Sequence, residues 1–312
     1  MVGVIGARVG VAWPYLMMAR RVLPGVPFIF DTVDLHHLRE EREAQLSENP
    51  AHAVRARTTR ELELAFIRAA DATFVVSPFE KELLGSVVPG ARVFVVPTVH
   101  AVRQEPVSAV GRDGMVFVGS FAHPPNADAI RWFLVEVLPL VRESLPHIGV
   151  TVVGRDAPPD VRALADEGVT FAGWVADLED VYGRARVAIA PLRYGAGLKG
   201  KVGEAMSYGV PVVGTSVAVE GMQIEHGATG WIADDARAFA EGIVTLHRND
   251  ELWARVSEAG RSHVEELLGT LAFERRLRAA LSEIGLDAGD PDVLRQAPDA
   301  SSVGAGNGAA GG

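Results

Sequence analysis

The sequence predicts an α/β protein with two doubly wound domains that face each other. Short apolar runs alternate with amphipathic helical stretches along most of the chain. This alternation occurs on both sides of a polar linker at residues 106–113, and it is typical of parallel sheets covered by helices. We therefore expect a first domain at residues 1–105 and a second at 114–268. A helix at 269–286 and a disordered tail at 287–312 should follow.

Composition excludes several classes of protein. The chain has 312 residues, of which 48% are hydrophobic, and this is enough for a large core. A formal net charge of −10 argues against a nucleic-acid partner. Cysteine is absent, so disulfides and thiolate metal sites are excluded. No apolar run reaches the roughly 18 residues of a membrane span and no signal peptide is evident, so we expect a cytoplasmic protein.

The first half alternates short strands with helices. A helix at residues 11–22 should end before Pro24, and a charged helical region at 38–70 should break near Asn49-Pro50. Ser77 and Glu80 predict the start of another helix, with Ser77 as N-cap and Glu80 completing a capping box. The predicted strands are 2–5, 28–30, 73–76 and 93–96.

The second half repeats this alternation. Asn126 is a candidate N-cap for a long amphipathic helix that ends near Val141, and Pro139 should bend or divide that helix. The predicted strands are 115–118, 149–154, 169–171, 187–192, 210–213 and 230–233, and the other predicted helices are 160–167, 178–184, 236–248, 251–265 and 271–284.

A glycine-rich turn at residues 195–203 predicts an anion site. It lies between an apolar run and a helical pattern, and it contains Lys199 and Lys201. Gly209 is a suitable residue to end that helix. Because the turn opens at a helix N-terminus, its free N–H groups and its lysines favour a phosphorylated ligand. The simpler interpretation is a flexible loop with solvated lysines.

Two other nucleotide motifs fit less well. Residues 195–201 match G-x-x-x-x-G-K, but Val202 stands where a P-loop needs Ser or Thr for magnesium. Residues 3–31 offer a strand, a glycine turn, a helix, a strand and Asp31, which is the order of a dinucleotide site. The glycine spacing from Gly3 differs from G-x-G-x-x-G, so an ordinary crossover is favoured.

Asp34 and His36 are candidate catalytic residues. They follow the predicted strand at 28–30, and ligands of open α/β sheets bind at the carboxyl ends of strands. The alternative is that Asp34 caps the next helix.

Four segments also carry a family resemblance. In chain order they are 68–77 (RAADATFVVS), 116–126 (VFVGSFAHPPN), 171–175 (FAGWV) and 203–213 (GEAMSYGVPVV). Together they resemble GT-B-fold nucleotide-sugar glycosyltransferases of the large retaining group called family four. The last segment, which is similar to the EAMA-x-G-x-P-V-V signature, is the most specific. The resemblance covers residues 27–268.

The chain departs from the family pattern in three places. The family has several more strands and helices before the equivalent of Phe28, so the first domain is expected to be incomplete and the chain N-terminally shortened. The family has two glutamates eight positions apart. Glu204 matches the second, and Ala196 stands in place of the first. The family often has Arg and Lys after the second domain's first strand, where this chain offers only His123.

The resemblance implies a retaining sugar transfer from a nucleotide-diphosphate sugar to an acceptor hydroxyl, by a front-face route. No metal or cofactor is expected, because the only Asp-x-Asp pair is Asp290-Pro-Asp292 in the tail. A role in cell-envelope polysaccharide or glycolipid biosynthesis and peripheral membrane association are also implied. The implied site is Gly119, Ser120, Arg193, Gly195, Gly197, Lys199 and Lys201 for the diphosphate, Glu204 for the ribose, Gly173, Trp174 and Val175 for the base, and Asp34 and His36 on the acceptor side.

Two other functions fit parts of the sequence. A short first domain and the missing glutamate favour a non-catalytic module that binds nucleotide sugars. The motif at residues 3–31 leaves an NAD-dependent oxidoreductase as a further alternative.

Overall fold

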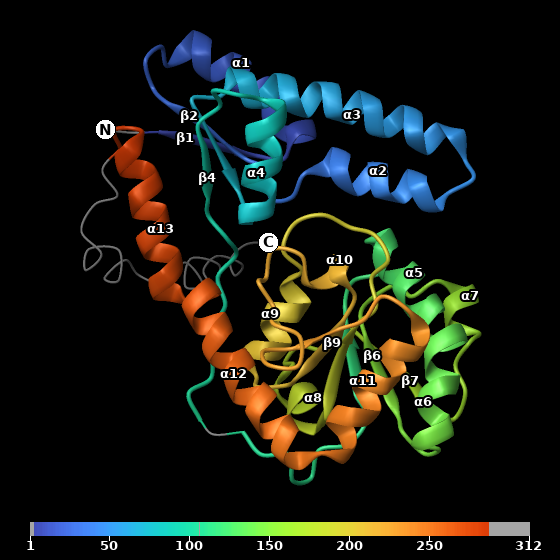
Figure 1. Ribbon diagram of the computed structural model, residues 1–312. Coiled ribbons are helices and arrows are strands. Elements are labelled where there is room, and N and C mark those ends of the chain that lie inside the picture. Colours follow the sequence, from blue (N-terminus) through green and yellow to red (C-terminus); the bar gives the residue numbers. More distant parts are fainter. Residues whose placement is uncertain (1–2, 106, 287–312) are drawn as a thin grey trace, which may run out of the picture.

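The computed structural model describes residues 3–105 and 107–286. Two α/β domains lie one above the other, and the chain returns from the second to the first through α12 and α13 (Figure 1). The predicted disordered tail at 287–312 lies outside the described residues, as does residue 106 of the predicted linker.

The first domain contains a parallel sheet with strand order β1-β2-β3-β4. This order does not reverse within the described residues, so no switch point lies among these four strands. The strands are β1 (Val4–Ala7), β2 (Phe28–Asp31), β3 (Ala72–Val75) and β4 (Val93–Val95), and the helices are α1 (Val9–Val22), α2 (His36–Leu46), α3 (Pro50–Ala69) and α4 (Pro78–Val87).

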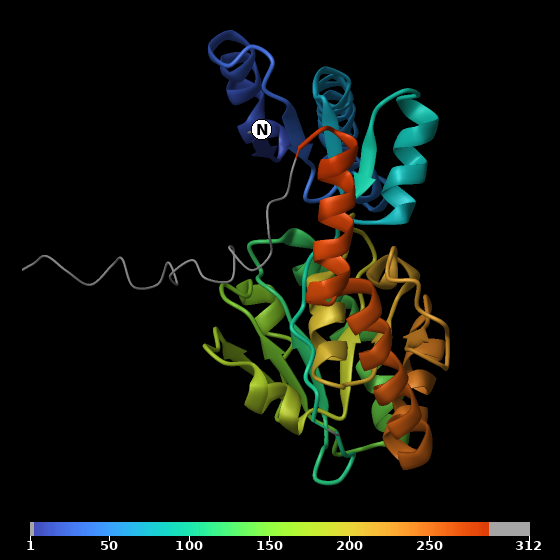
Figure 2. The same ribbon diagram turned by 90° about the vertical axis from the view of Figure 1, so that its left-hand side faces the viewer.

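Both faces of this sheet are covered. Phe28 and Phe30 pack against Phe66 of α3 on one face, whereas Ile29 points to the other face and joins a cluster with Ala280. Successive residues of a strand alternate between faces, so the apolar run of β2 supplies both cores. Ala280 belongs to α13 (Thr270–Glu283), which crosses the sheet in Figure 2. The C-terminal helix thereby fastens the second domain to the first.

The second domain is doubly wound, as predicted. Its sheet has the order β10-β9-β8-β5-β6-β7, and all pairs are parallel. The order reverses between β5 and β8, which places the expected ligand site at the carboxyl ends of these two strands. The strands are β5 (Met115–Val118), β6 (Val150–Val153), β7 (Val169–Gly173), β8 (Val187–Ala190), β9 (Val212–Gly214) and β10 (Trp231–Ile232).

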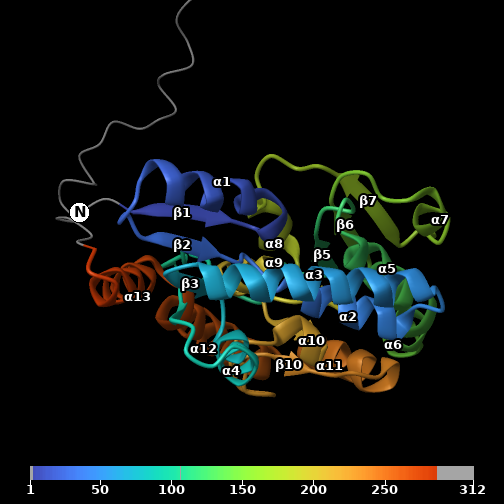
Figure 3. The ribbon, with the colours of Figure 1, turned by 90° about the horizontal axis from the view of Figure 1, so that it is seen from above.

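Helices surround this second sheet, and Figure 3 shows both domains from above. The long helix predicted to bend or divide at Pro139 is divided, because residues 133–137 form a π-helical segment and α6 begins at Leu138, next to Pro139. Gly209 ends α9 with φ of 68°, as predicted. The elements are α5 (Pro124–Trp132), η1 (Phe133–Val137), α6 (Leu138–Ser144), α7 (Pro159–Arg162), α8 (Glu179–Arg184), α9 (Gly200–Ser207), α10 (Ser216–Val219), α11 (Ala236–Arg248) and α12 (Asp250–Leu268).

Two capping predictions need correction. The Oγ of Ser77 accepts a hydrogen bond from the Glu80 N–H as predicted, but the Glu80 carboxylate accepts from Val76 and Leu35 instead of closing a capping box. Asn126 lies inside α5, whose N-cap is His123. Its side-chain amide instead donates to the Ser120 carbonyl and accepts from Lys201.

The outer surface of the first domain is unusually apolar. Val11, Tyr15, Met18 and Val22 are 58–65% exposed and lie on one stripe of α1, at spacings of four, three and four residues. Beside them β1 occupies the edge of the sheet. Large exposed apolar patches usually mark interaction surfaces. Among the described residues, no helix combines the length and the apolarity that a bilayer crossing requires.

Candidate functional site

A cleft of about 640 Å³ opens between the two domains. Its first wall comes from the carboxyl ends of β1 and β2 and from the start of α2. Its second wall comes from the carboxyl ends of β5 and β8 and from the start of α9. Both walls are therefore strand ends, where open α/β sheets bind ligands, and the second wall includes the switch point.

The glycine-rich loop brings Lys199 to the cleft. Lys199 is only 8% exposed, and its Nζ donates a hydrogen bond to the carbonyl of Gly197 at 2.7 Å. Burial lowers the pKa of Lys199 to about 8. Gly197 has φ of 70°, and a Cβ there would lie 2.8 Å from the Cβ of Asp34, so the loop closely approaches the first domain at this point.

Lys201 lies at the switch point. Its Nζ donates to the side-chain oxygen of Asn126 and lies 4.4 Å from the centre of the Phe117 ring. Burial, together with the charge of Lys199, lowers the pKa of Lys201 to about 7. A Cβ on Gly119 would come within 2.9 Å of this Nζ, so a larger residue there would displace the ammonium group.

Glu204 lines the same wall from the second turn of α9. The hydroxyl of Tyr182 donates to its Oε2 at 3.3 Å, and Tyr182 is held by stacking on Tyr208 with the ring centres 4.9 Å apart. Burial raises the pKa of Glu204, and the hydrogen bond from Tyr182 partly opposes this. The other carboxylate oxygen makes no hydrogen bond with a described residue, so it can accept from a ligand hydroxyl.

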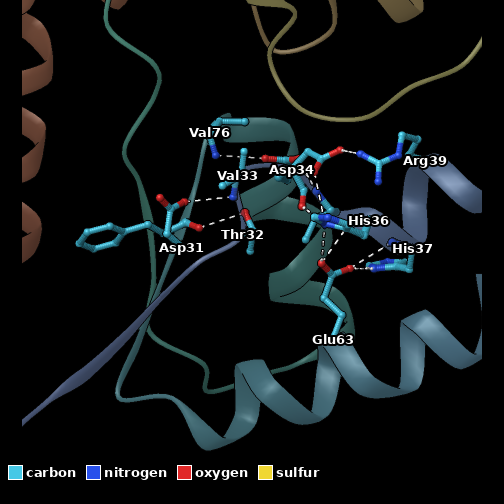
Figure 4. A network of polar contacts seen from close by, with 12 residues as sticks. Asp31, Thr32, Val33, Asp34, His36, His37, Arg39, Glu63 and Val76 are labelled. Atoms are coloured by element: carbon cyan, nitrogen blue, oxygen red, sulfur yellow. Dashed lines mark hydrogen bonds and ion pairs between the residues drawn. The ribbon is translucent and has the colours of Figure 1, made fainter. Parts of the chain in front are cut away.

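A polar network forms the opposite wall (Figure 4). The Nδ1 of His36 lies 3.3 Å from Asp34 Oδ1 and 3.6 Å from Glu63 Oε1. Glu63 is fully buried, and its Oε2 lies 2.6 Å from the Nδ1 of His37. Asp34 also forms an ion pair with Arg39, one turn further along α2. One side of the His36 ring is therefore held by carboxylates.

The contacts in this network lower the pKa of Glu63 and raise the pKa of His36. Burial alone would raise the pKa of Glu63, but the hydrogen bonds from His36 and His37 outweigh it and lower that pKa to about 2. The hydrogen bond to Glu63 in turn raises the pKa of His36, with a further contribution from Asp34. An ionised Glu63 thus favours the imidazolium form of His36.

Two buried carboxylates also position the start of α2. Its N-cap, Leu35, provides no side-chain hydrogen bond. Instead Glu80 accepts from the Leu35 N–H, and Glu63 accepts from the N–H groups of His36 and His37. The alternative that Asp34 caps this helix is wrong, because its carboxylate contacts His36 and Arg39.

Most of the predicted site residues meet at this cleft. Arg193 does not line it and instead forms an ion pair with Asp128. The segment at 173–175 also lies outside the lining, and Trp174 is 63% exposed, with the guanidinium of Arg155 5.6 Å from its ring. Gly197 does not line the cleft either, but its carbonyl accepts from Lys199. The predicted residues that line the cleft are Asp34, His36, Gly119, Ser120, Gly195, Lys199, Lys201 and Glu204.

Sequence reasoning missed several lining residues. Arg8, Arg39, His100 and Asn126 line the cleft together with Ala196, which stands in place of the family's first glutamate. Arg39 follows His36 by three residues and so lies on the same helix face, so the sequence spacing could have predicted that Arg39 lines the cleft. His100 comes from the segment between the domains, and its Nε2 is buried with no partner among the described residues.

The structure also bears on the dinucleotide alternative. Gly6 lies within β1 and Gly10 within α1, and the turn between these elements is formed by Arg8. The glycines are therefore not where a pyrophosphate would approach the backbone.

The fold and the cleft define a two-domain α/β protein with two lysines beside the switch point of its second domain. Residues 112–249 match the model of the family described as Glycosyl transferases group 1. The predicted α/β class and GT-B resemblance are thereby confirmed. The expected N-terminal shortening stays a prediction.

Known proteins resemble this chain in sequence and in fold. The phosphatidyl-myo-inositol mannosyltransferase of Mycobacterium leprae (strain TN) is 29% identical over 157 residues, which are 48% of this chain and 41% of that protein. The chain spans less than half the length of the curated relatives it matches.

Solved structures share both domains. Sucrose-phosphate synthase from Thermosynechococcus elongatus has a TM-score of 0.72 at 20% identity and covers 90% of this chain and 73% of its own. HepE from Anabaena, in complex with UDP and glucose, has a TM-score of 0.68 at 12% identity and covers 89% and 78%. At such identities the likeness shows the GT-B fold alone.

Proposed function

We propose that this protein transfers a sugar from a nucleoside-diphosphate sugar to an acceptor hydroxyl in the cytoplasm, with retention of configuration and without a metal ion. The observation that carries the proposal is the meeting of Lys199, Lys201 and Glu204 at the start of α9, beside the switch point. Two ammonium groups suit a diphosphate, and a carboxylate suits the two hydroxyls of a ribose. The family of residues 112–249 and the UDP in the HepE structure support this donor.

The lysines would act on the departing diphosphate. When the bond between the anomeric carbon and the diphosphate oxygen breaks, negative charge grows on that oxygen. Lys199 and Lys201 are held by Gly197 and Asn126 before substrate arrives, so they need little reorganisation to meet this charge. The same charge makes magnesium unnecessary in this proposal. Among the described residues, no three His, Asp or Glu side chains gather as a metal site.

The acceptor would bind between the two walls. Its hydroxyl oxygen attacks the anomeric carbon from the face on which the diphosphate leaves, and a diphosphate oxygen takes the hydroxyl proton. Asp34 and His36, which line the first wall, would orient the hydroxyl. Peripheral association with a membrane through the apolar stripe of α1 completes the proposal.

Calorimetric titration with UDP, GDP and their sugars, followed by assays of donor hydrolysis and transfer, tests the proposal. We expect one nucleotide sugar to bind and turn over, in EDTA as well as in magnesium. Lys199→Ala and Lys201→Ala should weaken binding about tenfold or more, since each removes a charge-assisted contact. Lys81→Ala is the matched control, because Lys81 is exposed on α4.

The outcomes separate the alternatives. Binding without turnover for every donor and acceptor would favour the non-catalytic module. Stabilisation by NAD and not by any nucleotide sugar would favour the oxidoreductase. Normal nucleotide binding by both lysine variants would remove the proposed diphosphate site.

A further inference from the structure

The first wall of the cleft carries an unpaired positive charge. Arg8 lines this wall at the end of β1, near Asp34 and Arg39 of the same wall. Arg39 is already paired with Asp34. Arg8, by contrast, forms neither an ion pair nor a side-chain hydrogen bond with any residue that the structure describes. Because a guanidinium is charged at every relevant pH, an anion is the natural ligand of Arg8.

The backbone at Arg8 is strained. Its φ is 62°, a left-handed conformation that favours glycine. Val33 has φ of 64° and lines the same wall. Such residues persist only where the surrounding structure holds them, and they gather at functional sites. The strain at Arg8 is consistent with a side chain that is kept for what it binds.

The proposed donor does not use this charge. Its diphosphate would be met by Lys199 and Lys201, which belong to the second domain. Arg8 belongs to the first domain, together with Asp34 and His36, which would orient the acceptor. The anion that Arg8 binds should therefore be part of the acceptor.

We propose that the acceptor carries a phosphate group near the hydroxyl that receives the sugar, and that Arg8 binds this phosphate. The inference rests on the proposed function. His36 lines the same wall, and its Nε2 supplies a further N–H donor, because only its Nδ1 faces Asp34 and Glu63. A phosphate, with its three terminal oxygens, can accept from such a set, and the guanidinium can bind two of them in parallel.

The binding test first fills the donor site. The protein is saturated with UDP, or with GDP if that binds more tightly, and is then titrated with glucose 6-phosphate or with glucose by calorimetry. We expect the phosphate ester to bind at least about tenfold more tightly than glucose, the gain typical of one charge-assisted contact. Arg8→Gln should abolish this preference, and Arg8→Lys should retain part of it.

Arg21→Gln serves as the matched control. Arg21 is exposed at the far end of α1 and does not line the cleft, so the phosphate preference should be unchanged. Thermal unfolding of each variant verifies that it is folded. A preference that survives Arg8→Gln, or equal affinity for glucose and its phosphate in the unaltered protein, would overturn the inference.

A second arm identifies the source of the phosphate. The nucleotide-loaded protein is sedimented with phosphatidylcholine vesicles that either contain or lack phosphatidic acid. Binding that requires phosphatidic acid and Arg8 assigns a lipid phosphate, whereas binding of glucose 6-phosphate alone assigns a soluble one. Failure to bind UDP or GDP at all would instead contradict the proposed function, because that step does not involve Arg8.

Discussion

Arg42 of the first domain and Glu220 of the second form a paired contact that joins the two domains. Their two N–O distances are 2.9 Å and 2.6 Å, and the side chains are only 19% and 17% exposed. The Nη1 of Arg42, which donates to Oε1 of Glu220, also donates to the carbonyl oxygen of Gly195 at 2.6 Å. One guanidinium thus holds the glycine-rich loop and the segment after α10 against α2.

This contact should affect nucleotide binding. Arg42→Ala frees the loop at Gly195, so we expect nucleotide affinity to fall several-fold. Glu220→Ala should have a similar effect, because Arg42 then loses the partner that orients it. In a double-mutant cycle on calorimetric affinities, the two residues should couple by about 1–3 kcal/mol, as neighbours in one polar network do.

The control for this cycle is Arg55→Ala. Arg55 forms ion pairs with Glu40 and Glu43 within the first domain, and its side chain is 48% exposed. Its loss should leave nucleotide affinity unchanged. Additive effects of the Arg42 and Glu220 substitutions would contradict a link between this ion pair and the loop.

Nucleotide binding should be accompanied by proton uptake near pH 8. In the free protein the pKa of Lys199 is lowered to about 8 and that of Lys201 to about 7. A bound diphosphate favours the charged lysines and raises both pKa values, so protons enter on binding and affinity falls as pH rises above about 7. Calorimetry at pH 8 in buffers of different ionisation enthalpy measures the uptake.

A substitution of Lys201 tests which lysine takes up the protons when the nucleotide binds. Lys201→Met should remove most of the uptake at pH 8, because the lysine with the lower pKa is the more fully deprotonated in the free protein. Lys81→Met should not change it, since Lys81 is exposed on α4. A binding enthalpy that does not depend on the buffer would show that the lysines are already charged.

Local patterns predicted the second domain well. Four of its strands, β5, β6, β8 and β9, are mostly buried apolar runs, and the turn with Lys199 and Lys201 lies between a strand and a helix, as the residue order indicated. Glu204 could be anticipated for the same reason, since it follows the turn by a few residues. Such features depend on neighbours in sequence, and single-sequence reasoning reaches them.

Other parts of the site depend on contacts between distant residues. Glu63 belongs to the charged helical region at 38–70, yet it is fully buried and lies 3.6 Å from the Nδ1 of His36, from which it is separated by 27 positions. Asn126 contacts Lys201 across 75 positions. The strand order of the first sheet likewise follows from pairing, which composition does not encode. Arg193 is paired with Asp128 because the fold brings α5 beside β8.

The stripe on α1 should bind to membranes. Val11, Tyr15, Met18 and Val22 are more than half exposed, and Arg21 adds positive charge. We expect sedimentation with anionic vesicles, and the double variant Val11→Ser, Met18→Ser should weaken it by about tenfold or more, since each loses roughly 1 kcal/mol of apolar transfer. Val54→Ser, at a similarly exposed site on α3, is the control. A protein that stays in the supernatant would contradict this role.

Two buried glutamates of the first domain should make stability depend on pH in opposite directions. The pKa of Glu63 is lowered to about 2 by its hydrogen bonds to His36 and His37, which outweigh burial. Its contribution is complete above the ordinary pKa of 4.5 and is lost as pH falls toward 2. A difference of 2.5 between the ordinary and the lowered pKa corresponds to about 3 kcal/mol. The free energy of unfolding should therefore fall by about 3 kcal/mol less between pH 4.5 and pH 2 in Glu63→Gln than in the unaltered protein.

The pKa of Glu80 is shifted upward, so its contribution to stability is lost as pH rises. Burial raises its pKa to about 7, and hydrogen bonds from Leu35 and Val76 offset only part of this. The folded protein therefore holds a proton that the unfolded chain has released, and stability falls as pH rises from about 4.5 to 7. Urea unfolding measures the free energy of unfolding at pH 5 and at pH 8. Between these pH values it should fall by about 3 kcal/mol more in the unaltered protein than in Glu80→Gln. Glu82→Gln, exposed on the same helix, should match the unaltered protein. Equal pH dependence in all three proteins would mean that Glu80 ionises normally despite its burial.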